Sequence, residues 1–221
     1  MGRGLLAAVP IVLGYLPIAF SFGVAAKRAG LSEAEAVMLS AVIYAGAAQF
    51  LALALVTSGA SLVVAALTLI AMNVRHLLYG PALLKAAGAK RAARSVWGWG
   101  FGLTDEVFGA ALGHLARGGA FSERFMWGLG AGSYASWVLG TVLGAMAGGA
   151  ALQGWPVLDA ALGFMLPALF LALLLSILSR AQVPVIVVAG GVVVVVTLSA
   201  TPTLGILAGM VAGAVAGMVR R

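Results

Sequence analysis

Residues 67–80 read Leu-Thr-Leu-Ile-Ala-Met-Asn-Val-Arg-His-Leu-Leu-Tyr-Gly, and this stretch poses the main question about the fold. Its first half closes an apolar run that is long enough to sit in a lipid bilayer. Asn73, Arg75 and His76 then follow within one turn. An arginine near the centre of a membrane helix costs at least about 2.5 kcal/mol on insertion scales. Arg75 therefore lies either at the membrane surface or along a polar path through the protein.

The composition is that of an integral membrane protein. Of the 221 residues, 63% are hydrophobic and 9% are charged, whereas a soluble domain has about 25% charged residues. The sequence has no cysteine, which excludes disulfides and thiolate metal sites. The net charge of +7 does not indicate binding to nucleic acid, because the largest basic cluster lies between two apolar runs, where a membrane surface explains it. That cluster consists of Lys85, Lys90, Arg91 and Arg94.

Eight apolar segments follow one another with short links, and about 20 apolar residues are enough to cross a bilayer as a helix. The valine run Val192–Val196 is expected to be helical too, because an isolated strand in lipid leaves its backbone groups unpaired. We predict an all-α, polytopic membrane helix bundle, with one transmembrane domain over residues 1–221, in the cell inner membrane. The segments are Leu5–Ala26, Ala36–Val56, Leu62–Leu78, Val96–Leu115, Phe125–Gly148, Val157–Leu178, Val183–Leu198 and Leu204–Val219.

The number of true crossings is predicted to be between six and eight. If all eight segments cross, Lys and Arg divide equally between the two sides, which is unusual for a membrane protein. If the fourth segment enters and leaves on one side, nearly all of them lie on the cytoplasmic side. Asp105 and Glu106 in its middle favour such a broken or re-entrant helix. The first segment is a second candidate for a break, because Pro10 and Pro17 interrupt its backbone hydrogen bonding.

Segments one to three show a weak sequence similarity to segments four to six. An internal duplication is one interpretation, since repeated units with broken helices are common in secondary transporters, and chance is the other. The matching positions are Phe22-Gly23 and Phe108-Gly109, Leu31-Ser32-Glu33 and Phe121-Ser122-Glu123, and Tyr44-Ala45 and Tyr134-Ala135.

Small residues recur every fourth position in two segments, and a step of four stays on one helical face. Such a smooth face lets a neighbouring backbone approach closely. It serves either packing within the chain or the docking of a separate subunit. The two stripes are Gly128, Gly132, Ser136, Gly140, Gly144 and Gly148, and Gly205, Gly209, Gly213 and Gly217.

Asp105 and Glu106 are the acidic residues with the strongest functional signal. Thr104 before them could cap a helix that begins at Asp105, so that both acids lie on its first turn at membrane depth. One functional interpretation is that one acid accepts a proton or the amine of a substrate. A structural interpretation, which does not exclude the first, is that the pair neutralises Arg75 or caps the helix.

Other polar groups lie near these acids in the predicted bundle. Arg75 is either an anchor at the membrane surface or a clamp for a carboxylate. Asn73 and His76 share a helical face, and His76 could titrate near neutral pH. Tyr44 and Gln49 are polar groups in an otherwise apolar helix, where Gln49 either bridges helices or contacts a substrate. The sequence has no catalytic motif, no ATP-binding loop and no metal-ligand spacing, so we expect neither an enzyme nor a cofactor.

Taken together, several blocks of this sequence resemble the AzlC family. Those blocks are Gly14–Gly23, Gly30-Leu31-Ser32, Tyr44–Phe50, Asn73–Gly80 and Thr104-Asp105-Glu106. The resemblance implies a bacterial or archaeal permease for branched-chain amino acids, associated with export. It also implies a second, smaller AzlD-like membrane subunit.

These expectations combine into one functional hypothesis, a secondary transporter that exports branched-chain amino acids and is driven by protons. Arg75 would bind the carboxylate of the substrate, and Asp105 or Glu106 would bind its amine or carry the proton. Tyr44, Gln49, Asn73 and His76 complete the predicted substrate site. The alternative hypothesis is a non-catalytic membrane scaffold that functions only within a complex.

Overall fold

The structure is a computed structural model that describes residues 1–88, 95–148 and 182–219, with separate positions between 155 and 180. The described residues are largely helical and include no β-strand. The chain divides into two compact units, Met1–Leu166 and Pro167–Arg221, and the prediction of a single domain stays a prediction. Several predicted features lie outside the described residues, namely most of the segment Val157–Leu178 and the basic residues Lys90, Arg91 and Arg94.

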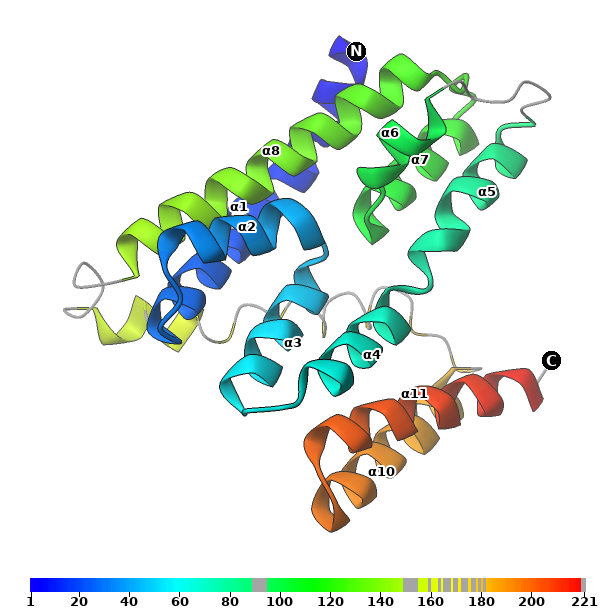
Figure 1. The fold of residues 1–221 in the computed structure, drawn as a ribbon. Helices are drawn as coiled ribbons and strands as arrows, with labels where there is room; N and C mark the ends of the chain where they lie inside the picture. Colours follow the sequence, from blue (N-terminus) through cyan, green and yellow to red (C-terminus); the bar gives the residue numbers. More distant parts are fainter. Residues whose placement is uncertain are drawn as a thin grey trace. The chain divides into compact units, whose positions relative to one another are not determined.

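Two long helices, α1 (Gly2–Arg28) and α8 (Glu123–Ala147), lie side by side in the first unit (Figure 1). The small-residue stripe of α8 faces α1, because a Cβ on Gly140 or Gly144 would meet backbone atoms of α1. Gly4 and Gly23 of α1 meet the backbone of α8 in the same way. The predicted stripe therefore serves packing within the chain, and it brings two backbones close together.

The predicted break in the first segment is wrong. Helix α1 runs without interruption through Pro10 and Pro17. Each proline removes one backbone hydrogen bond, but the close packing of α1 on α8 extends to both sides of the two prolines and favours a continuous helix. At 27 residues and about 1.5 Å per residue, α1 is long enough to cross a bilayer.

The second, third and fourth segments are each broken. Of these three segments, a break was predicted only in the fourth. The third helical stretch also continues past Leu78, where the sequence suggested that it ends, to Ala86. The half-helices are α2 (Glu33–Ile43) and α3 (Gly46–Thr57), α4 (Leu62–Asn73) and α5 (His76–Ala86), and α6 (Val96–Phe101) and α7 (Asp105–Ala116). In the described part of the chain, two stretches are long and apolar enough to cross a membrane, Gly2–Arg28 and Leu62–Ala86.

The break between α2 and α3 occurs at Tyr44, whose backbone is left-handed (φ 38°, ψ 44°) and ends α2. Ending a helix frees the carbonyl groups of its last turn, and these need new partners where water is absent. The hydroxyl of Tyr134 on α8 donates a hydrogen bond of 2.9 Å to the carbonyl oxygen of Ala41. Helix α8 thus supplies a partner for one of the carbonyl groups near the end of α2.

A ring of buried polar side chains also ties α2, α3 and α8 together across this break. The Gln49 amide donates to Ser40 Oγ at 2.8 Å and accepts from Trp137 Nε1 at 2.6 Å. Ser40 Oγ and Thr141 Oγ1 are 2.6 Å apart, and Thr141 Oγ1 donates to the Trp137 carbonyl oxygen. Gln49, Ser40 and Thr141 are fully buried, so each of these hydrogen bonds forms away from water and its loss would leave a polar group unpaired.

Helix α2 begins with a capping box formed by Ser32 and Glu35. Ser32 Oγ accepts from the backbone N–H of Glu35, and the Glu35 carboxylate accepts from the hydroxyl and the N–H of Ser32. These hydrogen bonds hold the pKa of the Glu35 carboxyl below its ordinary value.

The second unit contains α10 (Val183–Ser199) and α11 (Pro202–Val219), which pack against each other. The run Val192–Val196 lies within α10, so the helix predicted for it is confirmed. A Cβ on Gly205 or Gly209 of α11 would meet Val193 or Thr197 of α10. The second glycine stripe therefore also packs largely within the chain.

We predict that Gly23→Ala lowers the melting temperature of the protein in detergent, whereas Gly14→Ala does not. A Cβ at Gly23 would overlap backbone atoms of Thr141 and Ala145 on α8, and overpacking of this kind costs about 1–3 kcal/mol. Gly14 lies on the same helix with open space around it. Equal melting temperatures for the two variants would contradict the close α1–α8 packing.

We also predict that Gln49→Leu destabilises the protein by roughly 1–3 kcal/mol, because it leaves the buried N–H of Trp137 without an acceptor. The control is Thr57→Ala, which removes a hydroxyl that donates to carbonyl groups of its own helix at an exposed position. Thermal unfolding of the two variants in the same detergent compares them. If Gln49→Leu unfolds no earlier than Thr57→Ala, the polar ring does not hold the break.

Candidate functional site

Contacts between side chains bring the three helix breaks of the first unit together. The ring of Tyr44, at the break between α2 and α3, lies 6.0 Å from the ring of Phe101 at the end of α6. Arg75, between α4 and α5, forms an ion pair with Asp105 at the start of α7. The interrupted segments therefore present their polar residues to one another.

Helix α7 begins at Asp105, and Thr104 is its N-cap, as predicted. Thr104 Oγ1 accepts a hydrogen bond of 3.3 Å from the backbone N–H of Val107. Asp105 and Glu106 occupy the first turn, where the positive end of the helix dipole stabilises carboxylates. Thr104 is buried with 6% exposure, so this helix end lies inside the protein.

Asp105 is neutralised within the chain. The Arg75 Nη2 atom lies 2.8 Å from Asp105 Oδ2, and the Tyr79 hydroxyl donates to Asp105 Oδ1. The ring of Tyr79 stacks on Phe108 one turn further along α7, with the ring centroids 4.6 Å apart. The side chains of Arg75 and Asp105 are 49% and 38% exposed. The structural interpretation was that the pair of acids neutralises Arg75, and of the two it is Asp105 that forms the ion pair.

Glu106 has a different environment. Its Oε2 atom accepts a hydrogen bond of 2.6 Å from the hydroxyl of Tyr15, in the middle of α1. The same hydroxyl lies 2.6 Å from Thr104 Oγ1. Because the single hydrogen of Tyr15 points to Glu106, the Thr104 hydroxyl must donate to Tyr15. The hydrogen bonds therefore run from Thr104 through Tyr15 and end at the Glu106 carboxylate.

Asn73 and His76 lie at the break between α4 and α5, and the side chain of each contacts a backbone carbonyl group three or four residues earlier in the chain. Asn73 Nδ2 donates to the carbonyl oxygen of Leu69 at 2.9 Å. His76 Nδ1 lies 3.2 Å from the carbonyl oxygen of Asn73, and its ring meets that of Tyr79 edge to face. These side chains supply polar partners to backbone groups around the interruption.

Tyr44 and Gln49 lie on either side of the start of α3. Both are buried, but the amide of Gln49 is bonded to Ser40 and Trp137, which favours its role as a bridge between helices. The hydroxyl of Tyr44 is buried and has no hydrogen-bond partner within the described part of the chain. Of the two residues, Tyr44 is the one with an unused polar group.

Sequence reasoning missed Tyr15 as a partner of Thr104 and Glu106. Tyrosine in the middle of an apolar helix carries a hydroxyl that usually finds a partner when it is buried, and this was the available signal. Its partners on α7 are far away in sequence, so the pattern of α1 alone does not reveal them.

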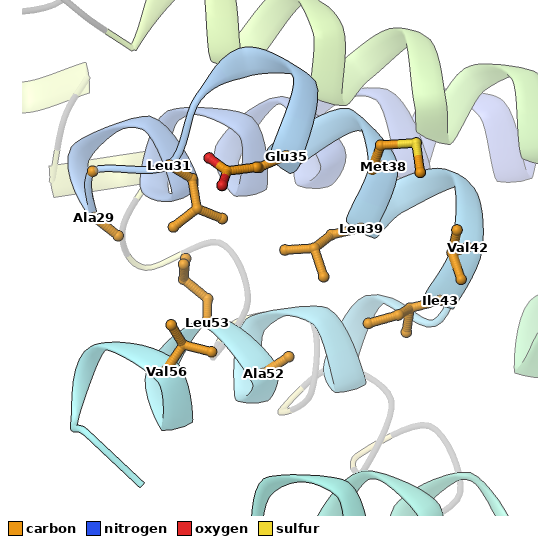
Figure 2. A pocket seen from close by; sticks show the side chains of 11 residues that line it. Ala29, Leu31, Glu35, Met38, Leu39, Val42, Ile43, Ala52, Leu53 and Val56 are labelled. Atoms are coloured by element: carbon orange, nitrogen blue, oxygen red, sulfur yellow. The ribbon is translucent and has the colours of Figure 1, made fainter. Parts of the chain in front are cut away.

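An apolar groove of about 660 Å³ lies between α2 and α3. Leu31, Leu39 and Leu53 point into it, and Glu35 is the one charged residue among the described residues that line it (Figure 2). None of Arg75, Asp105 and Glu106 lines this groove. Its apolar surface suits hydrocarbon, and it does not match the two charges of a zwitterion.

Comparison with known proteins agrees with the resemblance of the sequence to the AzlC family. The family model described as AzlC protein matches residues 10–151. The chain is 46% identical to the inner membrane protein YgaZ of Escherichia coli (strain K12) over 215 residues, which cover 96% of this chain and 87% of that protein. It is 39% identical to an uncharacterized membrane protein of Archaeoglobus fulgidus, over 96% of this chain and 91% of that one.

A more distant relative has a name that states a function. The branched-chain amino acid transport protein AzlC of Bacillus subtilis (strain 168) is 25% identical, over 76% of this chain and 64% of that protein. No solved structure matches the chain. The family is associated with membrane transport and not with catalysis. The match over most of the chain and the high identity to membrane proteins show that this chain belongs to the AzlC family.

Proposed function

We propose that this protein is a secondary transporter that exports branched-chain amino acids across the cell inner membrane, coupled to protons and together with a small AzlD-like subunit. The observation that carries the proposal is the cluster of Arg75, Asp105 and Glu106 at helix breaks in an otherwise apolar chain. Ionisable residues within membrane segments are costly and mark substrate or proton pathways.

The depth of the breaks supports this proposal. Helices α2, α3, α4 and α5 have 11 or 12 residues each, so at about 1.5 Å per residue each is roughly half as long as a bilayer core of about 30 Å. If the second and third segments cross the membrane, Tyr44 and Arg75 lie near its midplane. Transporters bind their substrates at this depth, between interrupted helices.

A neutral amino acid needs three kinds of contact, and residues of the cluster can supply them. Its carboxylate requires a cation, its amine requires an acid, and its side chain requires an apolar surface. We assign direct substrate contact to Tyr44, Arg75 and His76, and proton coupling to Asp105 and Glu106. Gln49 and Asn73, whose amides bond within the chain, would support the substrate site from beside it. The substrate class follows the name of the Bacillus subtilis relative, while export and the AzlD-like partner follow the resemblance to the family.

We predict that Glu106→Gln and Asp105→Asn each reduce pH-driven leucine efflux without abolishing expression. Each variant removes a carboxylate, and a hydrogen bond to a charged group is worth roughly 1.5–3 kcal/mol, which corresponds to about tenfold or more in flux. The measurement is efflux of radiolabelled leucine from proteoliposomes with an imposed pH gradient, with and without the small subunit.

Glu33→Gln is the matched control, since Glu33 is the first residue of α2 and contacts Lys27 at 3.7 Å with an exposed side chain. It should leave efflux unchanged. Normal pH-dependent efflux from both Glu106→Gln and Asp105→Asn would refute the assignment of proton coupling. Absence of leucine flux in the wild-type complex would refute the transporter itself and favour the scaffold hypothesis.

A further inference from the structure

Tyr44 carries two features that are costly for stability. Its side chain is 4% exposed, and its hydroxyl makes no hydrogen bond within the described part of the chain. Its backbone is left-handed, a conformation that residues with a Cβ avoid and that Gly or Asn adopts more easily. Buried unpaired polar groups are rare in folded proteins, and strained backbone concentrates at functional sites. Both features at one residue indicate a function for its hydroxyl.

The neighbours of Tyr44 fix its ring but leave its hydroxyl free. The Tyr134 ring packs edge to face on it at 4.9 Å, and the Tyr134 hydroxyl is occupied by the Ala41 carbonyl oxygen. Phe101 covers another part of the ring. Two sets of contacts connect the surroundings of Tyr44 to Glu106. Phe101, which covers the Tyr44 ring, ends the half-helix before α7. Tyr15, which binds Glu106, packs edge to face on Trp137 at 5.0 Å, and Trp137 binds Gln49 of the helix that follows Tyr44. The free hydroxyl and the carboxylate therefore belong to one local environment.

Glu106 can also accept more hydrogen bonds than the described residues give it. Within the described residues it has no ion-pair partner, whereas Asp105 is paired with Arg75. The Tyr15 hydroxyl binds only Oε2 of Glu106, and a carboxylate has acceptor sites on both oxygens. With one arginine against two acids, the cluster of Arg75, Asp105 and Glu106 has a net negative charge when all three are ionised. Such a cluster favours a cationic ligand group.

We propose that the primary ammonium group of the transported amino acid binds between the Glu106 carboxylate and the Tyr44 hydroxyl. This inference rests on the proposed function and names the part of the substrate that each residue contacts. An ammonium group has three donors, and Glu106 Oε1 and Tyr44 Oη are acceptors to which the described residues give no hydrogen bond. Tyr15 is a positioning residue, because it holds Glu106 through Oε2 and is itself held by Thr104. Asp105 serves as the counter-ion of Arg75.

The test uses Tyr44→Phe in the complex with the small subunit, reconstituted in proteoliposomes. The variant removes one oxygen atom that has no partner among the described residues, so its melting temperature should equal or exceed that of the wild type. The KM for leucine should rise about tenfold or more, because a buried hydrogen bond to a charged group is lost. Competition by 4-methyl-2-oxopentanoate, which has the leucine skeleton without the amine, should be weak in the wild type and relatively stronger in the variant.

Tyr134→Phe is the matched control. It removes a hydroxyl that bonds the Ala41 carbonyl oxygen, so it should lower the melting temperature and leave the KM for leucine unchanged. An unchanged KM in Tyr44→Phe, with normal wild-type flux, would overturn this inference and leave the proposed function intact. Absence of leucine flux in the wild type would overturn both.

Discussion

A helix that is interrupted inside a bilayer exposes carbonyl and amide groups where no water can bind them, and each needs a partner from the protein. At the break between α2 and α3, side chains of α8 help to meet that constraint, whereas Asn73 and Thr104 bind backbone groups at the other two breaks. The Tyr134 hydroxyl donates a hydrogen bond to the carbonyl oxygen of Ala41. Trp137 and Thr141 complete the ring of hydrogen-bonded side chains that includes Ser40 and Gln49. The interrupted helices can therefore remain interrupted because an unbroken, closely packed pair, α1 and α8, lies beside them.

The charged residues depend on the same arrangement. Arg75 and Asp105 compensate each other, so their cost in an apolar environment is reduced. Glu106 has no such compensation within the described residues and is held by a hydroxyl of α1. This asymmetry gives two adjacent acids on one helical turn different roles. The pair with Arg75 links the third segment to α7, and the carboxylate of Glu106 keeps capacity for a ligand or a proton.

Some of these features can be predicted from the sequence and others cannot, for physical reasons. The break before Asp105 follows from local chemistry, because two acids after a capping Thr104 are hard to place inside a continuous apolar helix. The break at Tyr44 has no local signal, since tyrosine does not favour a left-handed backbone and the contacts that hold it come from α8. The prolines of α1 gave a false signal, because tertiary packing outweighs the lost hydrogen bonds. The partnership of Tyr15 with Glu106 joins distant parts of the chain, which no periodicity reveals.

We propose that the helix breaks line a water-filled path through which an amino acid passes. The chain has no cysteine, so single cysteines can be introduced as probes without background. A charged, membrane-impermeant thiol reagent reacts with the thiolate, which forms in water and not in hydrocarbon. We predict that Ala45→Cys, at the break, is labelled and that leucine protects it, whereas Val42→Cys on the exposed face of α2 is not labelled. Labelling of Val42→Cys alone, or labelling of Ala45→Cys that leucine does not change, would contradict this account.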